Sequence, residues 1–145
     1  MLVEKLKEAC SSIGWNFNYG RGHWQNLNDF PDDSNKAFPQ RAKYFLLLWK
    51  DRDFKINDYG AVVGYSFEGE AVLCVRSKIS DPDYNFKYEE HIKNLEIEAE
   101  KLFEDFTSCE EWTMKRWKEI EVENEYDTNL DGLKVRFTVE FEIAE

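Results

Sequence analysis

The first apolar positions of the chain recur at the spacing of one helical face. Four residues three or four positions apart make up this face: Val3, Leu6, Cys10 and Ile13. Because an α-helix turns once in about 3.6 residues, the spacing predicts an amphipathic helix that ends near Gly14. Residues 15–19 then alternate between an aromatic side chain and Asn, which predicts a short strand.

Residues 20–41 show no strong period and are rich in Gly, Pro, Asn and Asp, which predicts a long loop. Loops of about twenty residues are uncommon in compact domains and are usually functional or mobile. This loop carries four large apolar side chains: Trp24, Leu27, Phe30 and Phe38. They either cover the edge of the core or bind a partner, and the sequence leaves both open.

The middle of the chain has the features of strands. The apolar run 44–49 predicts a strand that is covered on both faces. The charged residues 50–53 predict a loop after it. Residues 61–67 and 70–76 predict two strands of a β-hairpin, with Glu68 and Gly69 as the turn.

A long helix is predicted over residues 86–108. Six residues in steps of three or four form its apolar stripe: Tyr88, Ile92, Leu95, Ala99, Leu102 and Phe106. Glu and Asp residues occupy the other side. The stripe spans barely three heptads, so a helix packed on a sheet is favoured over a coiled coil.

Two alternating stretches follow. In the first, residues 117–126, the apolar face carries Trp117, Ile120, Val122 and Tyr126, and the other face carries Glu119, Glu121, Glu123 and Glu125. A turn is predicted over residues 127–132. From Leu133 to Ile143 every second residue is apolar, which predicts a strand with one buried face.

Together these elements predict an α+β fold. We expect a mostly antiparallel sheet of about six strands, one long amphipathic helix packed on it, and a short N-terminal helix. The length of 145 residues is typical of a single domain. No linker, repeat or low-complexity tract divides the chain, so we expect one domain over residues 1–145.

Composition and charge narrow the classes of function. With 42% hydrophobic and 16% aromatic residues the chain can build a core, which argues against disorder. The net charge is −11, and residues 89–127 hold 14 acids but only 5 bases. Such a segment repels phosphate, which argues against tight nucleic-acid binding through it. It is either a solvated helix face or a surface that faces DNA without gripping it.

Cysteine usage and hydropathy indicate the compartment. Cys10, Cys74 and Cys109 are far apart in sequence, and none belongs to a Cys-x-x-Cys pair. We expect buried, reduced thiols in a cytosolic product. No signal peptide is visible, and the longest apolar run, 44–49, is far shorter than a membrane span. We therefore expect a soluble chain with no membrane partner.

Candidate chemistry is scarce. His91 has no second His or Cys three or four residues away, so we expect a surface histidine rather than a metal ligand. His23 follows Gly20, Arg21 and Gly22, a turn whose N–H groups could cradle a phosphate. However, the full G-x-G-x-x-G pattern is absent and polar loop residues follow. The sequence thus predicts no catalytic residues, no metal and no cofactor.

One resemblance supplies a more specific expectation. Its residues are the Tyr-Gly-Arg-Gly loop opening at 19–22 with Leu27-Asn28, the strand from Tyr44, and the closing Asn-Leu-Asp-Gly segment at 129–132. With the order of elements, they make nearly the whole chain resemble the tail-terminator and tail-completion (neck) ring subunits of tailed bacteriophages. This resemblance implies a virion structural protein without catalytic residues, made in the host cytoplasm.

The resemblance also implies partners and surfaces. Copies would assemble into a ring at the head–tail junction or tail end, beside other phage head–tail or tail proteins, with DNA passing through as non-specific cargo. Loops 20–41 and 51–59 are the interface candidates, with Arg21, His23, Trp24, Leu27, Phe30, Phe38, Arg52 and Phe54. The lumen-facing acidic candidates are Glu119, Glu121, Glu123 and Glu125. The alternatives are a small acidic interaction module, such as an adaptor or a nucleic-acid-mimicking inhibitor, and an enzyme of unrecognised class.

Overall fold

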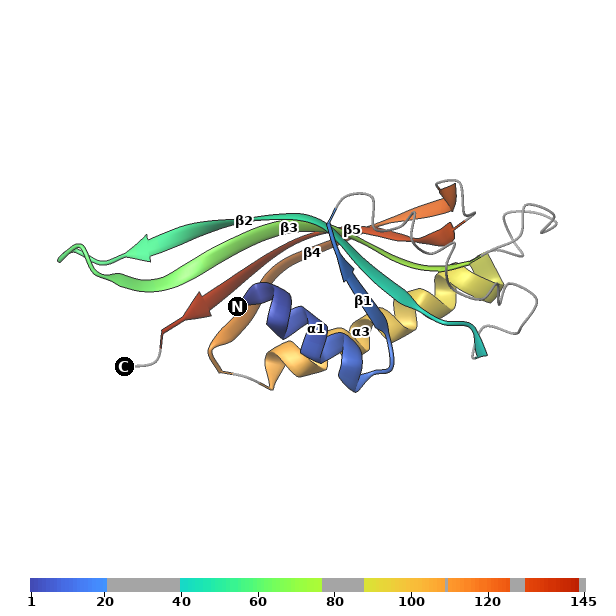
Figure 1. The fold of residues 1–145 in the computed structure, drawn as a ribbon, viewed down its shortest axis with the longest axis horizontal. Helices are drawn as coiled ribbons and strands as arrows, with labels where there is room; N and C mark the ends of the chain where they lie inside the picture. The colour runs from blue at the N-terminus through green and yellow to red at the C-terminus, as the bar shows by residue number, and fades with distance from the viewer. Residues whose placement is uncertain (21–39, 77–87, 109, 126–129, 144–145) are drawn as a thin grey trace.

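The computed structural model describes residues 1–20, 40–76, 88–108, 110–125 and 130–143. In these residues the helices lie on one face of a five-stranded sheet (Figure 1). The predicted α+β fold with a mostly antiparallel sheet is therefore confirmed. The described sheet has five strands rather than about six, because two predicted strands form one continuous strand.

The sheet has the strand order β1-β2-β3-β5-β4. Its strands are β1 (Asn16–Tyr19), β2 (Tyr44–Ile56), β3 (Val62–Arg76), β4 (Trp112–Glu125) and β5 (Leu130–Glu142). β1 is short and runs parallel to β2, whereas the other neighbouring pairs are antiparallel. β1 and β4 therefore form the two outer strands of the sheet.

The helices are α1 (Leu2–Ser12) and α3 (Lys93–Thr107), and a π-helical turn, η3 (Tyr88–Ile92), leads into α3. The predicted stripe of the long helix is confirmed, since Tyr88 is partly buried and the other five residues are fully buried. The two α-helices touch each other: the Ser12 hydroxyl donates a hydrogen bond of 2.6 Å to the Asp105 carboxylate. Together they cover one face of the sheet.

The main core lies between these helices and the sheet. Its largest buried side chains include Phe45, Phe67, Phe106 and Phe137. Burying a side chain of this size stabilises the fold by roughly 1.5–3 kcal/mol. A second, smaller cluster lies on the opposite face of β2 and β3: Tyr44, Leu46, Val72 and Cys74. Residues 44–47 are thus buried on both faces, as their apolar run predicts.

The predicted hairpin turn at Glu68 and Gly69 is wrong, because β3 runs through both residues without a break. Gly69 serves close packing instead. A Cβ atom at Gly69 would lie 2.7 Å from the Phe137 ring and 3.0 Å from the Trp49 carbonyl oxygen. Glycine inside a strand often marks such a close approach rather than a turn.

The predicted loop at residues 50–53 is also wrong, because these residues continue β2. Asp51 pairs with Glu68, and Asp53 pairs with Ser66. β1 ends opposite Leu47, so in the described residues this part of β2 pairs only with β3. Charged side chains are common on such strand edges, because they oppose uncontrolled pairing with other chains.

His91 is fully buried, which contradicts its prediction as a surface residue. Its Nε2 atom is in hydrogen-bond contact with the guanidinium of Arg41, which is also buried. The physical reason is the π-helical turn, whose wider spacing departs from the 3.6-residue period. His91 and its neighbour Ile92 therefore both lie inside.

Candidate functional site

The β2–β3 hairpin projects beyond the helices as an arm, which we define as residues 52–65 (Figure 1). β5 gives the arm a third strand up to Glu142, which pairs with Gly64, and the N–H of Ile143 donates a last hydrogen bond of 3.0 Å to the Val63 carbonyl oxygen. The last cross-strand pair of the arm is Ile56 with Val62. In the described residues the end of the arm is therefore a two-stranded ribbon.

The tip of the arm, residues 57–60, is a turn held by one side chain. The Asn57 carboxamide oxygen accepts hydrogen bonds from the backbone N–H groups of Tyr59 (2.9 Å) and Ala61 (3.0 Å). Gly60 has a φ of 79°, a conformation that glycine adopts without steric cost. Asn and Gly are typical residues of such turns, so the local sequence itself fixes the end of the arm.

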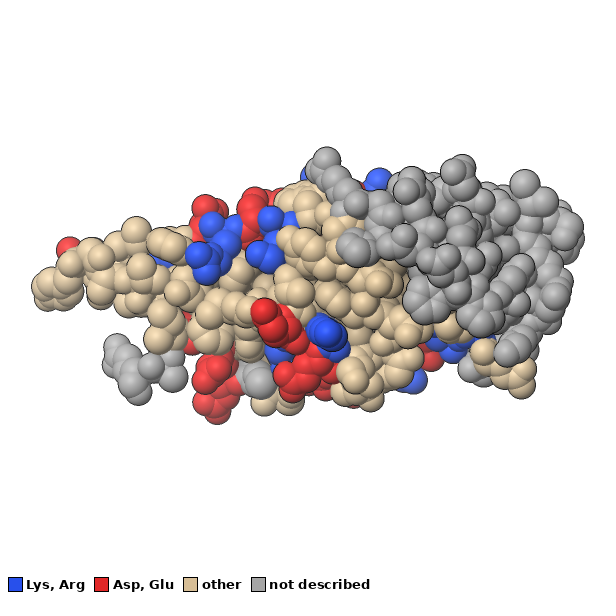
Figure 2. Space-filling view, in the orientation of Figure 1, with Lys and Arg blue, Asp and Glu red and all other residues tan. Residues whose placement is uncertain are grey.

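Exposed apolar side chains concentrate on the arm. Ten large apolar side chains are exposed in the described residues, and six of them lie on the arm or next to it: Phe54, Ile56, Tyr59, Val62, Val63 and Ile143. Tyr59 is 95% exposed and Ile56 61%. On the face that Figure 2 shows, the outer part of the arm is mostly uncharged. Contiguous exposed apolar surface of this kind marks an interaction site more often than single exposed residues do.

Aromatic contacts support the helix-facing side of the arm. The guanidinium of Arg52 lies 5.1 Å from the centre of the Phe54 ring and 5.0 Å from that of Tyr65. The rings of Phe54 and Tyr65 also meet edge to face, with centroids 5.6 Å apart. Tyr65 in turn stacks on Phe141. The structure thus brings together Arg52 and Phe54, two of the predicted interface residues, on an ordered aromatic surface.

An ion-pair network on the sheet face away from the helices ties the arm to β4 and β5. Glu140 of β5 lies 2.9 Å from the ammonium of Lys55 and 3.6 Å from that of Lys115. The hydrogen bond from Lys55 is the main cause that lowers the pKa of Glu140, and the positive charges of both lysines add to it. Glu140 therefore links β5 to the neighbouring strand β4 and, across β3, to β2.

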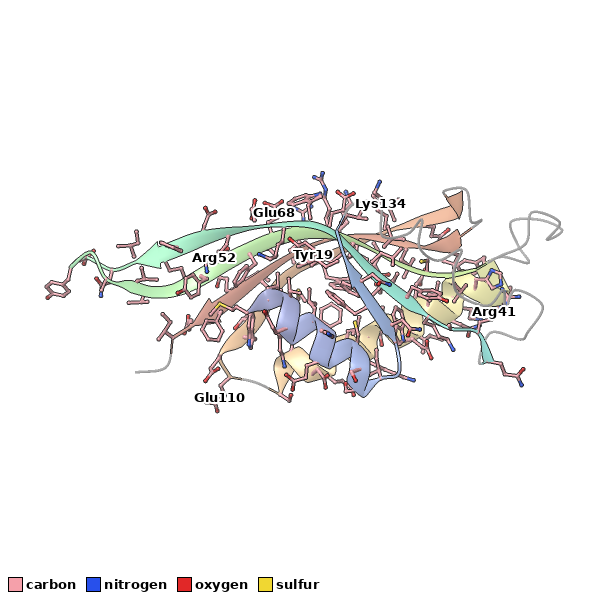
Figure 3. All side chains as sticks on the ribbon, viewed as in Figure 1. Tyr19, Arg41, Arg52, Glu68, Glu110 and Lys134 are labelled. Atoms are coloured by element: carbon pink, nitrogen blue, oxygen red, sulfur yellow. The ribbon has the colours of Figure 1, made fainter. Side chains whose placement is uncertain are left out.

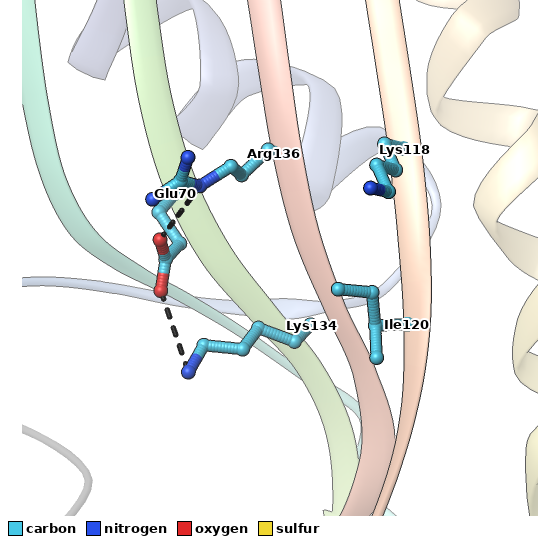
Figure 4. A pocket seen from close by; sticks show the side chains of 5 residues that line it. All are labelled: Glu70, Lys118, Ile120, Lys134 and Arg136. Atoms are coloured by element: carbon cyan, nitrogen blue, oxygen red, sulfur yellow. Dashed lines mark hydrogen bonds and ion pairs between the residues drawn. The ribbon is translucent and has the colours of Figure 1, made fainter.

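On the sheet face away from the helices, five residues of three strands line a shallow hollow: Glu70 of β3, Lys118 and Ile120 of β4, and Lys134 and Arg136 of β5 (Figure 4). Glu70 accepts a hydrogen bond of 3.2 Å from Arg136 and pairs with Lys134 at 3.5 Å. Lys134 points away from the helices (Figure 3). The residues that line the hollow include three cations and one carboxylate, so its lining is net positive in a chain of net charge −11.

Glu119 and Glu121 of β4 are exposed and form an acidic edge with Glu96 of α3. Partial burial raises the pKa of Glu96, and the negative charges of Glu119 and Glu121 raise it further. These three carboxylates are therefore close enough to repel one another. They lie on the helix side of the sheet, since Glu119 pairs with Val135, which is buried in the core.

The sequence predicts that Trp117 and the glutamates of β4 lie on opposite faces of the strand, and this prediction is wrong. Residues two positions apart in a regular strand share a face, and β4 is regular from Trp117 to Glu119. Trp117 therefore lies on the same face as Glu119, and its indole N–H donates a hydrogen bond of 2.8 Å to the Glu119 carboxylate. Ile120 is left on the opposite face, in the hollow.

Several predicted site residues lie outside the described residues: Arg21, His23, Trp24, Leu27, Phe30 and Phe38, with the side chains of Glu123 and Glu125. The sequence prediction missed most apolar residues of the arm and the whole hollow. The signal for the arm was the Asn-Asp-Tyr-Gly segment at 57–60, a turn sequence between apolar residues. The hollow had no such signal, because its residues meet only through the strand register.

Reactive groups in the described residues are few. Cys10 and Cys74 are buried thiols, as predicted, and Cys109 lies outside the described residues. Burial, and then the negative charge of Asp105, raises the pKa of Cys10 to about 12. The Cys10 thiol therefore stays protonated and unreactive at neutral pH. Among the described residues, no three His, Cys, Asp or Glu side chains form a metal-binding group.

No helix in the described part of the chain is both long and apolar enough to span a membrane. In comparisons with known proteins, no protein-family model matches the chain, and no curated protein matches it. The grounds for a function are therefore the arm, the hollow and the acidic edge, together with the pattern of the sequence.

Proposed function

We propose that the chain is a non-enzymatic virion structural protein that assembles with copies of itself into a ring at the phage head–tail junction or tail end. The observation that carries the proposal is the arm with its exposed apolar side chains. The phage setting, and the passage of DNA through the ring, come from the resemblance to tail-terminator and neck subunits.

The arm supports self-assembly because its exposure is costly. Removing apolar surface from water is worth about 25 cal/mol per Å², and aromatic residues are enriched in protein interfaces. Phe54, Ile56 and Tyr59 are each more than half exposed, and a two-stranded ribbon such as the end of the arm is marginally stable on its own. A partner surface would supply both cover and support for the arm.

The one-sided position of the arm favours a ring over a simple pair. A projection that binds a different surface on its neighbour makes a head-to-tail contact, and such contacts close into rings when the rotation between copies allows it. The acidic edge then offers a wall for a lumen. Its carboxylates would repel DNA phosphates and keep passing DNA from sticking.

Mass photometry and negative-stain electron microscopy of the purified chain test the assembly. We expect the unaltered chain to form rings. The triple variant Ile56→Ser, Tyr59→Ser, Val62→Thr should be a monomer. Its melting temperature should be close to that of the unaltered chain in its dissociated form. The matched control is Ile97→Ser, which removes an equally exposed apolar side chain from α3 and should leave rings intact. A chain that stays monomeric and is absent from purified virions would refute the proposal.

The acidic edge favours one second candidate, a small acidic interaction module that mimics nucleic-acid charge. Such a module binds a basic partner with a steep dependence on salt. Titration with poly-lysine at several salt concentrations tests it. Tight, salt-sensitive binding that is weakened by Glu119→Gln with Glu121→Gln, in a chain that forms no rings, would favour this candidate over the ring subunit.

A further inference from the structure

We propose that the tip of the arm docks in the hollow of a neighbouring copy of the same chain. This inference rests on the proposed function, because it names the two surfaces that would join one copy to the next. Its grounds are the chemistry of the two surfaces and their separation within one molecule.

The tip and the hollow are complementary in charge. The tip presents the carboxylate of Asp58 beside the nearly fully exposed ring of Tyr59. The hollow presents three cations, of which Lys134 and Arg136 share the single carboxylate Glu70. An acid from a second copy would therefore enter a site that still carries excess positive charge. Hydrogen bonds between ionised groups are among the stronger polar contacts.

The apolar parts of the two surfaces also match. Ile120 is half exposed in the hollow, where cations surround it (Figure 4). An aromatic ring such as that of Tyr59 could pack on Ile120 and lie against an ammonium or guanidinium group. Contacts between cations and aromatic faces contribute about 0.5–1 kcal/mol at exposed sites and more when water is excluded. Tyrosine thus suits this hollow better than an aliphatic residue would.

A single copy cannot make this contact with itself. Val62 at the end of the arm and Glu70 in the hollow belong to the same strand, β3, eight positions apart. At about 3.3 Å per residue they are separated by roughly 26 Å of extended chain. The tip is therefore held away from its own hollow, and only another molecule can fill it.

Docking of this kind joins two different surfaces, so each copy offers one tip and one hollow. The contact can then repeat from copy to copy, and it closes into a ring when the geometry permits. The proposal thereby explains why the apolar arm projects to one side while the positive hollow lies in the middle of the sheet.

Charge reversal on each side tests the contact. Asp58→Lys and Lys118→Glu each place like charges opposite one another, so each variant alone should associate roughly tenfold or more weakly than the unaltered chain. An equimolar mixture of the two variants should recover association, because opposite charges then meet at every contact between alternating copies. Mass photometry and light scattering at low salt measure both effects. The matched control for the change in net charge is Glu100→Lys, at an exposed position of α3. This variant should associate as the unaltered chain does.

The outcomes separate the inference from the proposed function. If the unaltered chain associates but the charge variants associate equally well, or their mixture recovers nothing, the copies join through other surfaces and this inference is wrong. If the unaltered chain itself remains a monomer, the proposed function fails and the inference fails with it.

Disulfide trapping gives a second readout that does not depend on charge. Tyr59→Cys in one preparation and Ile120→Cys in another, both with Cys109→Ser, should form a crosslinked pair after mixing and mild oxidation. Cys10 and Cys74 are buried and should not interfere. In the control mixture Ile120→Cys is replaced by Lys101→Cys, on the exposed side of α3. Equal crosslinking in both mixtures would overturn the proposed contact.

Discussion

The two ends of the β2–β3 hairpin differ in what covers them. At the inner end, residues 44–47 and 71–75 are buried on both faces of the sheet. At the outer end, the arm carries similarly apolar residues, such as Phe54, Ile56 and Val62, that are exposed. Both strands run from one end to the other, with shifts in their pairing between Leu47 and Trp49 and between Lys55 and Ile56. The difference teaches that the cover over each face of the strand, rather than the hydrophobicity of the strand, decides whether an apolar residue belongs to the core.

The arm also differs from an unstructured projection. Its turn is closed by Asn57, and the Arg52, Phe54 and Tyr65 side chains pack on one another. A surface that is both ordered and apolar loses little conformational entropy when it binds. The outer end of the hairpin is thus preorganised for a partner, as the inner end is for the helices.

Two matched Phe→Ala substitutions should show the largest difference between the two ends of the hairpin. Phe67→Ala, at the buried end, should lower the free energy of unfolding by about 3–5 kcal/mol, since it leaves a cavity in the core. Phe54→Ala, on the arm, should lower it by less than about 1 kcal/mol but weaken self-association. Urea denaturation and mass photometry measure the two effects.

Stability should be measured in the monomeric background Ile56→Ser, Tyr59→Ser, Val62→Thr, because assembly stabilises the folded state by mass action. Association of Phe54→Ala is measured in the unaltered chain. The comparison would fail if Phe54→Ala unfolded the chain as readily as Phe67→Ala, because the arm would then be part of the core.

Glycine substitutions give a second, smaller contrast. A methyl group at Gly132, opposite Cys74, would collide with the Leu73 carbonyl oxygen and lie 2.8 Å from Cα and Cβ of Cys74. Gly132→Ala should therefore cost about 1–3 kcal/mol. Gly60→Ala meets open space, so only its positive φ of 79° is unfavourable, at about 1 kcal/mol. Denaturation midpoints of the two variants in the monomeric background should show this order; a reversed order would mean that the tip is packed.

Much of the fold could be predicted from local periodicity. The stripe of α3 and the alternation from Leu133 to Phe141 depend only on the side chains within one element. The wrong predictions concern segments whose local sequence is compatible with two different structures. Gly69 was predicted as a turn residue but makes room for the Phe137 ring, and residues 50–53 were predicted as a loop but form an exposed strand edge.

The candidate site was less predictable, because it depends on register and cover. Lys134 and Arg136 could be assigned to an outward face of their strand, but their meeting with Glu70 requires the pairing of β3 with β5. His91 was misplaced because one wider helical turn changes which side faces the core. Such features depend on contacts between elements far apart in sequence. The pattern of residues within one segment carries no information about these contacts.

The smallest effect we predict concerns the ion pair that ties the arm to the rest of the sheet. Glu140 of β5 lies 2.9 Å from the ammonium of Lys55, which belongs to the arm. Because the pKa of Glu140 is lowered in the folded chain, its charged form stabilises the fold above the usual value of 4.5. This contribution is lost as the pH falls through the lowered pKa. Exposed pairs of this kind contribute about 0.2–1 kcal/mol.

Glu140→Gln should therefore be less stable than the unaltered side chain at neutral pH, and the two should converge in acid. Urea denaturation of both in the monomeric background, across that pH range, measures the difference. Glu142→Gln, at an exposed position of the same strand, is the control for removal of a carboxylate. A difference that persisted in acid would show that Glu140 acts through packing rather than charge.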